Sequence, residues 1–151
     1  MVDILHRVGV KASIDDVYKA LSTRDGLAGW WTTDTEWDGK SSGVIKFLFS
    51  LDGNVLGGFD MKVLELQPGK RVSWQVVAGP EEWIGTKIGF DLRQDGAYCM
   101  VLFKHQGWSE PVEFMHHCST KWATYLMSLK SLVENGKGAP NPNDLRISDR
   151  D

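Results

Sequence analysis

Apolar side chains recur at helical spacing over one long stretch near the end of the chain. They are Val112, Met115, Trp122, Leu126, Leu129 and Val133. Positions three and four residues apart share one face of an α-helix, so this stripe predicts an amphipathic helix over residues 112–134. Asn135-Gly136 follows, where glycine can end a helix in the left-handed conformation.

Earlier in the chain, apolar and polar residues alternate in short runs that are separated by glycine, proline and aspartate. Alternation with a period of two is typical of strands in antiparallel sheets that have one buried face. The predicted strands cover residues 4–10, 44–51, 55–66, 71–76, 86–92 and 97–105. Two short helices are predicted over 14–21 and 24–31, the first directly after Ser13, a residue type that caps helices.

The order of these elements predicts an α+β fold in which a curved antiparallel sheet wraps around the long C-terminal helix. Such an arrangement can leave a hollow between the sheet and the helix. A length of 151 residues is ordinary for one domain, and we assign that domain to residues 1–136. Residues 137–151 contain two prolines and few apolar side chains, so we expect a flexible tail there.

Several short motifs occur in an order that resembles a known group of proteins. They are Val17-Tyr18-Lys19-Ala20-Leu21, Leu27-Ala28-Gly29-Trp30-Trp31, the run VLELQPGKRVSW at 63–74, Gly85-Thr86, Gly96 and Gly107-Trp108. Over residues 3–136 their order resembles the helix-grip fold of the START/polyketide-cyclase (SRPBCC) superfamily. Within it the chain is similar to the homologues of the activator of heat-shock protein 90 ATPase. One departure is Lys121, which stands where that family usually has glycine before tryptophan.

Composition and charge narrow the classes of partner. The chain has 17 Lys and Arg against 20 Asp and Glu, a formal charge of −3, and no basic run, so we expect no nucleic-acid partner. No apolar stretch approaches the roughly 20 residues of a membrane helix, so we expect no membrane partner. Charges near the N-terminus argue against a signal peptide. We therefore expect a cytoplasmic protein in which Cys99 and Cys118 are free thiols.

Aromatic and apolar residues on the inward faces are the candidates for a ligand pocket. The predicted ligand-binding residues are Trp31, Phe47, Phe59, Met61, Trp74, Phe90, Met115, Ser119, Trp122 and His6. Core packing is an open alternative for Trp74 and Trp122, and both roles can hold at once. Of the pair Trp30-Trp31, we expect one ring to plug the open end of the sheet and the other to face the entrance. Ser119, His6 or Tyr98 would supply a polar contact in an otherwise apolar cavity.

The sequence contains no arrangement that points to a particular catalysis. His116 and His117 are adjacent and lack metal-ligand spacing, so we expect no metal and no cofactor. No Gly-x-Ser-x-Gly motif or phosphate loop is present. Glu65 points inward if the strand alternates without interruption, and a structural bond near the strand end is the alternative. We assign no catalytic residue and leave enzymatic activity open, with binding favoured.

The leading hypothesis is a monomer or homodimer that binds a small apolar or amphipathic ligand between the sheet and the helix. The resemblance also implies an alternative, a protein-interaction module that contacts a chaperone or another protein. That alternative predicts an exposed apolar patch around Trp83, Trp108 or Trp30. A cyclase or hydrolase type of enzyme is the third possibility that the superfamily implies.

Overall fold

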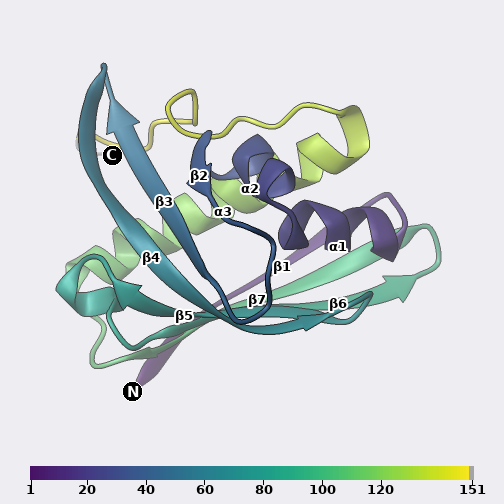
Figure 1. Ribbon diagram of the computed structural model, residues 1–151, viewed down its shortest axis with the longest axis horizontal. Helices are drawn as coiled ribbons and strands as arrows, with labels where there is room; N and C mark the ends of the chain where they lie inside the picture. Colours follow the sequence, from purple (N-terminus) through teal and green to yellow (C-terminus); the bar gives the residue numbers. More distant parts are fainter. Residues whose placement is uncertain (150–151) are drawn as a thin grey trace.

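The computed structural model describes residues 1–149, which form one seven-stranded sheet with helices on its concave side (Figure 1). The strands are β1 Val2–Val10, β2 Asp34–Glu36, β3 Val44–Leu51, β4 Asn54–Gln67, β5 Arg71–Ala78, β6 Lys87–Asp95 and β7 Tyr98–Trp108. The helices are α1 Ile14–Ser22, α2 Arg24–Trp30, the short 3-10 helix η1 Glu81–Trp83 and α3 Glu113–Asn135. The predicted α+β helix-grip fold is confirmed.

Strand pairing is antiparallel, in the order β1-β7-β6-β5-β4-β3-β2. Strands β2 to β7 are neighbours in chain order, and β1 pairs with β7 at the edge opposite β2. The sheet bends so strongly that the β3–β4 hairpin stands up from the other strands (Figure 1). The sequence pattern missed β2 because three residues are too few to show alternation.

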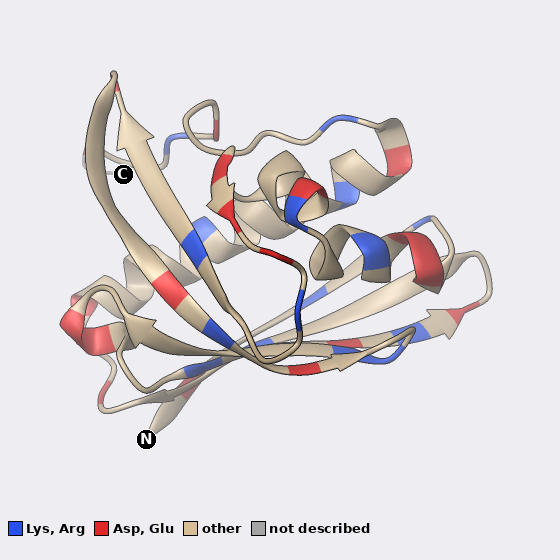
Figure 2. Cartoon of the chain, viewed as in Figure 1, with Lys and Arg blue, Asp and Glu red and all other residues tan. Residues whose placement is uncertain are grey.

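The long helix α3 covers the concave face with its predicted apolar stripe. Trp122, Leu126 and Leu129 are buried against the sheet. The helix begins and ends one residue later than predicted, and Gly136 follows it with φ 83°, the left-handed conformation that glycine adopts without strain. Charged residues of both signs are interspersed over the strands and helices (Figure 2).

Aromatic rings fill the space where α2, α3 and the sheet meet. The ring centroid of Trp31 lies 4.4 Å from Phe47, 4.9 Å from Trp122 and 5.9 Å from Trp74. Rings at such separations attract each other beyond their burial, by roughly 0.5–1.5 kcal/mol a pair. The cluster therefore ties the first half of the chain to the last helix.

Trp30 and Trp31 are the pair of which we expect one ring to plug the open end of the sheet and the other to face the entrance. Both are buried, because α2 is enclosed between α1, α3 and the sheet. Trp30 donates its indole N–H to the carbonyl of Ala20 at 3.0 Å. Trp31 lies one residue beyond the last helical position, where its ring reaches the sheet from the helix end.

Glu65 does not point inward, because β4 shifts register between Val63 and Glu65. This irregularity moves Glu65 to the outer face of the sheet, where Ser73 Oγ donates to its carboxylate at 3.2 Å. Arg71 Nη1 lies 3.6 Å from the same carboxylate and also pairs with Asp91. Of the two readings that the sequence leaves open for Glu65, the structural bond is confirmed.

The segment after α3 runs back along the molecule to the top of β3. Asn141 is buried, donates from Nδ2 to the Ser50 carbonyl at 2.9 Å and accepts the Ser50 N–H at 2.8 Å. Its backbone also bridges Thr32. That the tail is flexible stays a prediction. Asn141 is the residue that would anchor this segment to the rest of the protein.

A bulge and two glycines shape the tip of the β3–β4 hairpin and give a first prediction. The register of β3 against β4 shifts between Phe49 and Ser50, which marks a bulge next to Gly57. A Cβ on Gly58 would overlap the Phe47 carbonyl oxygen. We expect Gly58→Ala to lower the free energy of unfolding by about 2 kcal/mol in urea titrations.

The matched control is Gly89→Ala, also in a strand of the sheet. A Cβ there meets Ser73 Cβ at 4.0 Å, an ordinary contact. We expect its stability to stay within about 0.5 kcal/mol of wild type. Equal stability of the two variants would contradict the overlap at Gly58.

Candidate functional site

A cavity of about 540 Å³ lies between the β3–β4 hairpin, the η1 region and the N-terminal half of α3. Its walls come from five separate parts of the chain. They are lined by Trp31, Phe49, Leu56, Gly57, Gly58, Phe59, Gly79, Pro80, Trp83, Phe114, His117, Cys118, Lys121, Trp122, Tyr125, Asn141 and Asp144. The fold thus provides a hollow at one end of the concave face, while the other end is covered by α1 and α2.

The walls of this cavity are largely aromatic. Trp83 stacks on Phe59 with ring centroids 4.2 Å apart, and also lies parallel to Trp122 at 5.9 Å. Phe59 stacks in turn on Trp31 at 5.9 Å. Stacked rings that already fix each other's orientation make a wall that need not rearrange when an apolar molecule enters.

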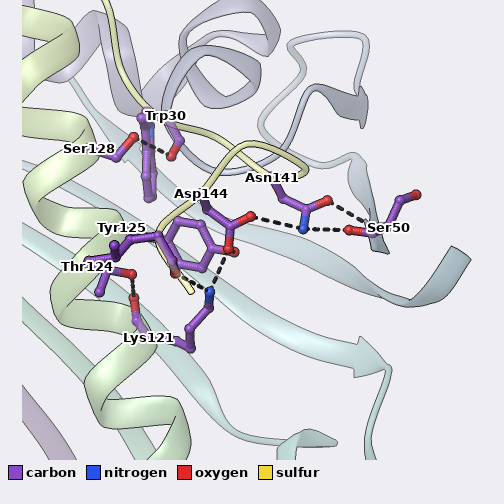
Figure 3. Close-up of polar contacts among 9 residues, drawn as sticks. Trp30, Ser50, Lys121, Thr124, Tyr125, Ser128, Asn141 and Asp144 are labelled. Atoms are coloured by element: carbon purple, nitrogen blue, oxygen red, sulfur yellow. Dashed lines mark hydrogen bonds and ion pairs between the residues drawn. The ribbon is translucent and has the colours of Figure 1, made fainter. Parts of the chain in front are cut away.

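One end of the cavity is polar, and its centre is the Asp144 carboxylate (Figure 3). Lys121 Nζ lies 2.5 Å from Asp144 Oδ2, and the Tyr125 hydroxyl donates to the same oxygen at 2.8 Å. Asn141 Nδ2 donates to Oδ1 at 3.3 Å. Lys121 and Tyr125 lie one turn apart on α3, whereas Asn141 and Asp144 come from the segment that follows it.

A chain of buried hydrogen bonds supports the wall from behind. Trp122 Nε1 donates to His105 Nδ1 at 3.2 Å, so the proton of the neutral ring lies on Nε2. That N–H donates to Thr86 Oγ1 at 2.8 Å, and Thr86 donates to the Trp83 carbonyl at 2.5 Å. The Trp83 indole N–H contacts Cys118 Sγ at 3.4 Å. Two of the three indole rings of the cavity wall, those of Trp83 and Trp122, are therefore held by polar bonds as well as by packing.

Burial controls the protonation of two groups in this region. Loss of water lowers the pKa of His105 to about 3, so its ring is neutral at physiological pH. Burial raises the pKa of the Cys118 thiol to about 12; the Trp83 hydrogen bond opposes this rise and the charge of Glu82 adds to it. A thiol of such high pKa stays protonated and is a poor nucleophile.

The chain matches the family model described as Activator of Hsp90 ATPase homolog 1-like protein over residues 11–134. A solved structure with high sequence similarity, the solution structure of the Aha1 dimer from Colwellia psychrerythraea, is 48% identical and has a TM-score of 0.80. That match covers 91% of this chain and 100% of the other. The chain belongs to this family.

More distant structures share the fold with this member of the activator family. CV1439 from Chromobacterium violaceum is 21% identical with a TM-score of 0.72, and the match covers 89% of this chain and 99% of that one. CalU16 from Micromonospora echinospora is 18% identical with a TM-score of 0.69, over 93% and 77% of the two chains. At such identities the likeness shows the fold alone. No curated protein matches the chain significantly.

Three of the ten predicted ligand-binding residues line the cavity: Trp31, Phe59 and Trp122. Four others belong to the filled core beneath it and lie outside the lining; they are Phe47, Met61, Trp74 and Phe90. The sequence left core packing and pocket lining open for Trp74 and Trp122. In the structure Trp74 packs in the core alone, whereas Trp122 packs in the core and also lines the cavity. The sequence placed all these side chains on the inward face without showing at which end the helices fill the hollow.

The remaining predicted residues lie away from the cavity lining. His6 Nε2 is 3.1 Å from the Ser119 carbonyl oxygen and 3.3 Å from Ser119 Oγ, so these two residues join β1 to α3. Met115 packs at the edge of the core. Tyr98, the third candidate for a polar contact, is exposed, and Lys130 Nζ lies 5.7 Å from its ring centroid.

The polar end of the cavity was not predicted from the sequence. Asn141 and Asp144 fall in the expected tail, and nothing in their spacing indicates that they meet α3. Lys121 gave the one available signal, because the resemblance to the family leads us to expect glycine at this position and the chain has a long cation there. Within residues 1–149, no three His, Cys, Asp or Glu side chains gather as metal ligands would, and no helix is long and apolar enough to cross a membrane.

The buried histidine predicts a pH dependence of stability. Unfolding releases His105 to its ordinary pKa near 6.5, so below that pH the unfolded chain binds a proton that the folded chain refuses until about pH 3. Stability is therefore full above pH 6.5 and falls as the pH drops. Between pH 7 and 5 this group alone should cost about 2 kcal/mol in urea unfolding.

The variant His105→Gln should remove this part of the slope, whatever its stability at pH 7. His116→Gln, which removes an exposed histidine from α3, is the control. A wild-type slope retained in His105→Gln would show that the ring of His105 takes up its proton in the folded state.

Proposed function

We propose that the protein binds a small apolar or amphipathic molecule in the cavity between the β3–β4 hairpin, η1 and α3. A volume of about 540 Å³ lies within the range of roughly 300–1,000 Å³ that small-molecule sites occupy. The single observation that carries the proposal is that seven aromatic side chains surround this space: Trp31, Phe49, Phe59, Trp83, Phe114, Trp122 and Tyr125.

The physical support is a contrast between the two ends of the concave face. Near α1 and α2 the face is filled by the chain's own rings, whereas beyond Trp122 the rings line open space. An apolar molecule that covers accessible apolar surface removes that surface from water, which favours binding by about 25 cal/mol per Å² of surface covered. We infer that such a molecule enters past Leu56, a residue of the hairpin that is 56% exposed.

We propose binding in preference to catalysis because of the chemistry of the lining. Its thiol, Cys118, is held protonated by burial. The Asp144 carboxylate accepts bonds from three protein donors, which leaves it poorly placed to act as a general base. The free buried thiols Cys99 and Cys118 support a cytoplasmic location. We also propose that residues 1–136 form the domain and 137–151 its flexible C-terminal tail, of which residues 150–151 lie outside the described part of the chain.

A second candidate function is interaction with another protein, either a second copy of the chain or a chaperone. The expected patch at Trp83, Trp108 or Trp30 is wrong, because all three are buried. Exposed apolar residues gather elsewhere: of the 12 large ones among the described residues, five lie on β3 and β4, namely Val44, Leu48, Val55, Leu56 and Leu64. The similar protein from Colwellia psychrerythraea is a dimer in solution, which favours this reading.

Ligand binding is tested with variants at the cavity mouth. Leu56 lines the cavity, and its neighbour Val55 does not, although both are exposed on the same hairpin. For a ligand found by native mass spectrometry and tryptophan fluorescence titration, we expect Leu56→Asp to weaken binding about tenfold, or about 1.4 kcal/mol, because a carboxylate replaces apolar contact surface.

The control Val55→Asp places the same charge one residue away and should leave the affinity within about twofold of wild type. Equal effects of the two variants would show that the ligand sits elsewhere. Failure of a broad lipid and aromatic library to bind the wild type would count against the proposed function itself.

The interaction reading is tested by mass in solution. We expect light scattering after size exclusion to give twice the 16.9 kDa of one chain. Leu48→Glu, on the exposed face of β3, should return the mass to that of a monomer, because an interface core does not tolerate an unpaired buried charge. Leu5→Glu, which replaces an exposed leucine of β1 at the far edge of the sheet, is the control. A wild-type monomer would reject the homodimer.

A further inference from the structure

We propose that the ligand carries a carboxylate, and that Lys121 and Tyr125 bind it in place of the Asp144 carboxylate. This inference rests on the proposed function, because it specifies the ligand of the same cavity. It assigns the polar end of the cavity as a carboxylate site that the chain's own C-terminal segment fills when no ligand is bound.

The geometry at Asp144 is that of a recognition site for a carboxylate. Both oxygens are engaged, Oδ2 by Lys121 at 2.5 Å and by Tyr125 at 2.8 Å, and Oδ1 by Asn141 at 3.3 Å (Figure 3). The side chains of Lys121 and Asp144 are only 12% and 11% exposed. Charge-assisted hydrogen bonds of this kind are stronger than neutral ones, and partial burial strengthens them further.

Two of the three donors belong to a rigid element, whereas the acceptor does not. Lys121 and Tyr125 lie four residues apart on α3, and Lys121 Nζ is 5.2 Å from the Tyr125 ring centroid. Asp144 lies outside any helix or strand, and its neighbour Leu145 is exposed. The Asp144 carboxylate can therefore leave while Lys121 and Tyr125 keep their places on the helix.

The segment has a fixed point beside the part that must move. Asn141 is buried and bonded to Ser50 through both of its side-chain groups, three residues before Asp144. Asn141 thus stays on β3 while Asp144 swings away. Opening then breaks contacts of the residues after Asn141, which include the hydrogen bond from Lys121 Nζ to the Leu145 carbonyl at 3.0 Å and the surface ion pair of Arg146 with Asp52.

Charge balance selects a carboxylate over a cation as the ligand group. Lys121 and Asp144 are the charged pair of the lining, so an added ligand charge stays unpaired unless one of them is displaced. A cation would have to displace Lys121, which is part of α3. An anionic ligand would instead displace Asp144, so that one carboxylate replaces another. Lys121 then keeps a partner of opposite charge, and no partly buried charge is left unpaired. The apolar body of the ligand then covers the aromatic wall.

The test compares decanoate with decan-1-ol, a neutral molecule of equal chain length, by isothermal titration calorimetry. The measured quantity is the ratio of the two dissociation constants, in wild type and in variants checked for folding by circular dichroism. Asp144→Asn removes the competing charge and keeps the shape, so we expect it to shift the ratio about tenfold in favour of decanoate.

Lys121→Met in the Asp144→Asn background removes the cation and should reverse that shift. Tyr125→Phe is a milder second variant that should weaken decanoate about threefold or more relative to decanol. The control Asp25→Asn removes an exposed carboxylate of α2, whose partner Arg24 lies outside both the lining and the C-terminal segment. It should leave the ratio unchanged.

The outcomes separate this inference from the proposed function. If both molecules bind and the ratio of their dissociation constants is the same in all variants, the carboxylate site is overturned, whereas the proposal of apolar binding is retained. Binding of decanol alone would do the same. Binding of neither molecule to the wild type or to Asp144→Asn would overturn the inference and count against the proposed function for long-chain ligands.

Discussion

The rest of the structure depends on the contact of three indole rings on the concave face of the sheet: Trp31 directly after α2, Trp83 in η1 and Trp122 in α3. Trp122 projects from α3 into this contact and meets Trp31 at 4.9 Å and Trp83 at 5.9 Å. Its N–H is also bonded to His105 on β7. These ring contacts and this hydrogen bond can form together only at one distance of α3 from the sheet and one rotation about its axis. They therefore fix the position of the helix.

The position of the cavity follows from where this contact ends. Toward α1 and α2 the concave face is covered twice, by the short helices and by the C-terminal half of α3. Toward the β3–β4 hairpin, η1, the N-terminal half of α3 and the C-terminal segment line the cavity together with the bent sheet. The hollow is thus a consequence of two short helices that cover half of a long curved sheet, and the stacked rings of Trp83 and Phe59 keep its wall in place.

Polar groups buried in this aromatic interior give it specificity at an energetic cost. His105, Thr86 and the Trp83 carbonyl satisfy one another in a chain that allows only the neutral ring. By contrast, the indole N–H groups of Trp74 and Trp108 have no partner among the described residues. A buried donor left unpaired costs about 1–3 kcal/mol, which the burial of such large rings offsets. The interior is therefore held mainly by apolar burial, with one satisfied polar chain that fixes the orientation of the wall.

The sequence by itself determined the long elements of this protein and the faces that they bury, but not the three-residue elements β2 and η1. Periodicity alone placed α3 to within one residue at each end, and alternation put Phe47, Trp74 and Phe90 on the buried face, because these patterns are local. The tertiary structure decided which inward residues line a space and which fill it. It also decided that β4 shifts register before Glu65 and that Asp144 meets α3 across the turn at Gly136. These features depend on how segments distant in the chain pack, which no local pattern encodes.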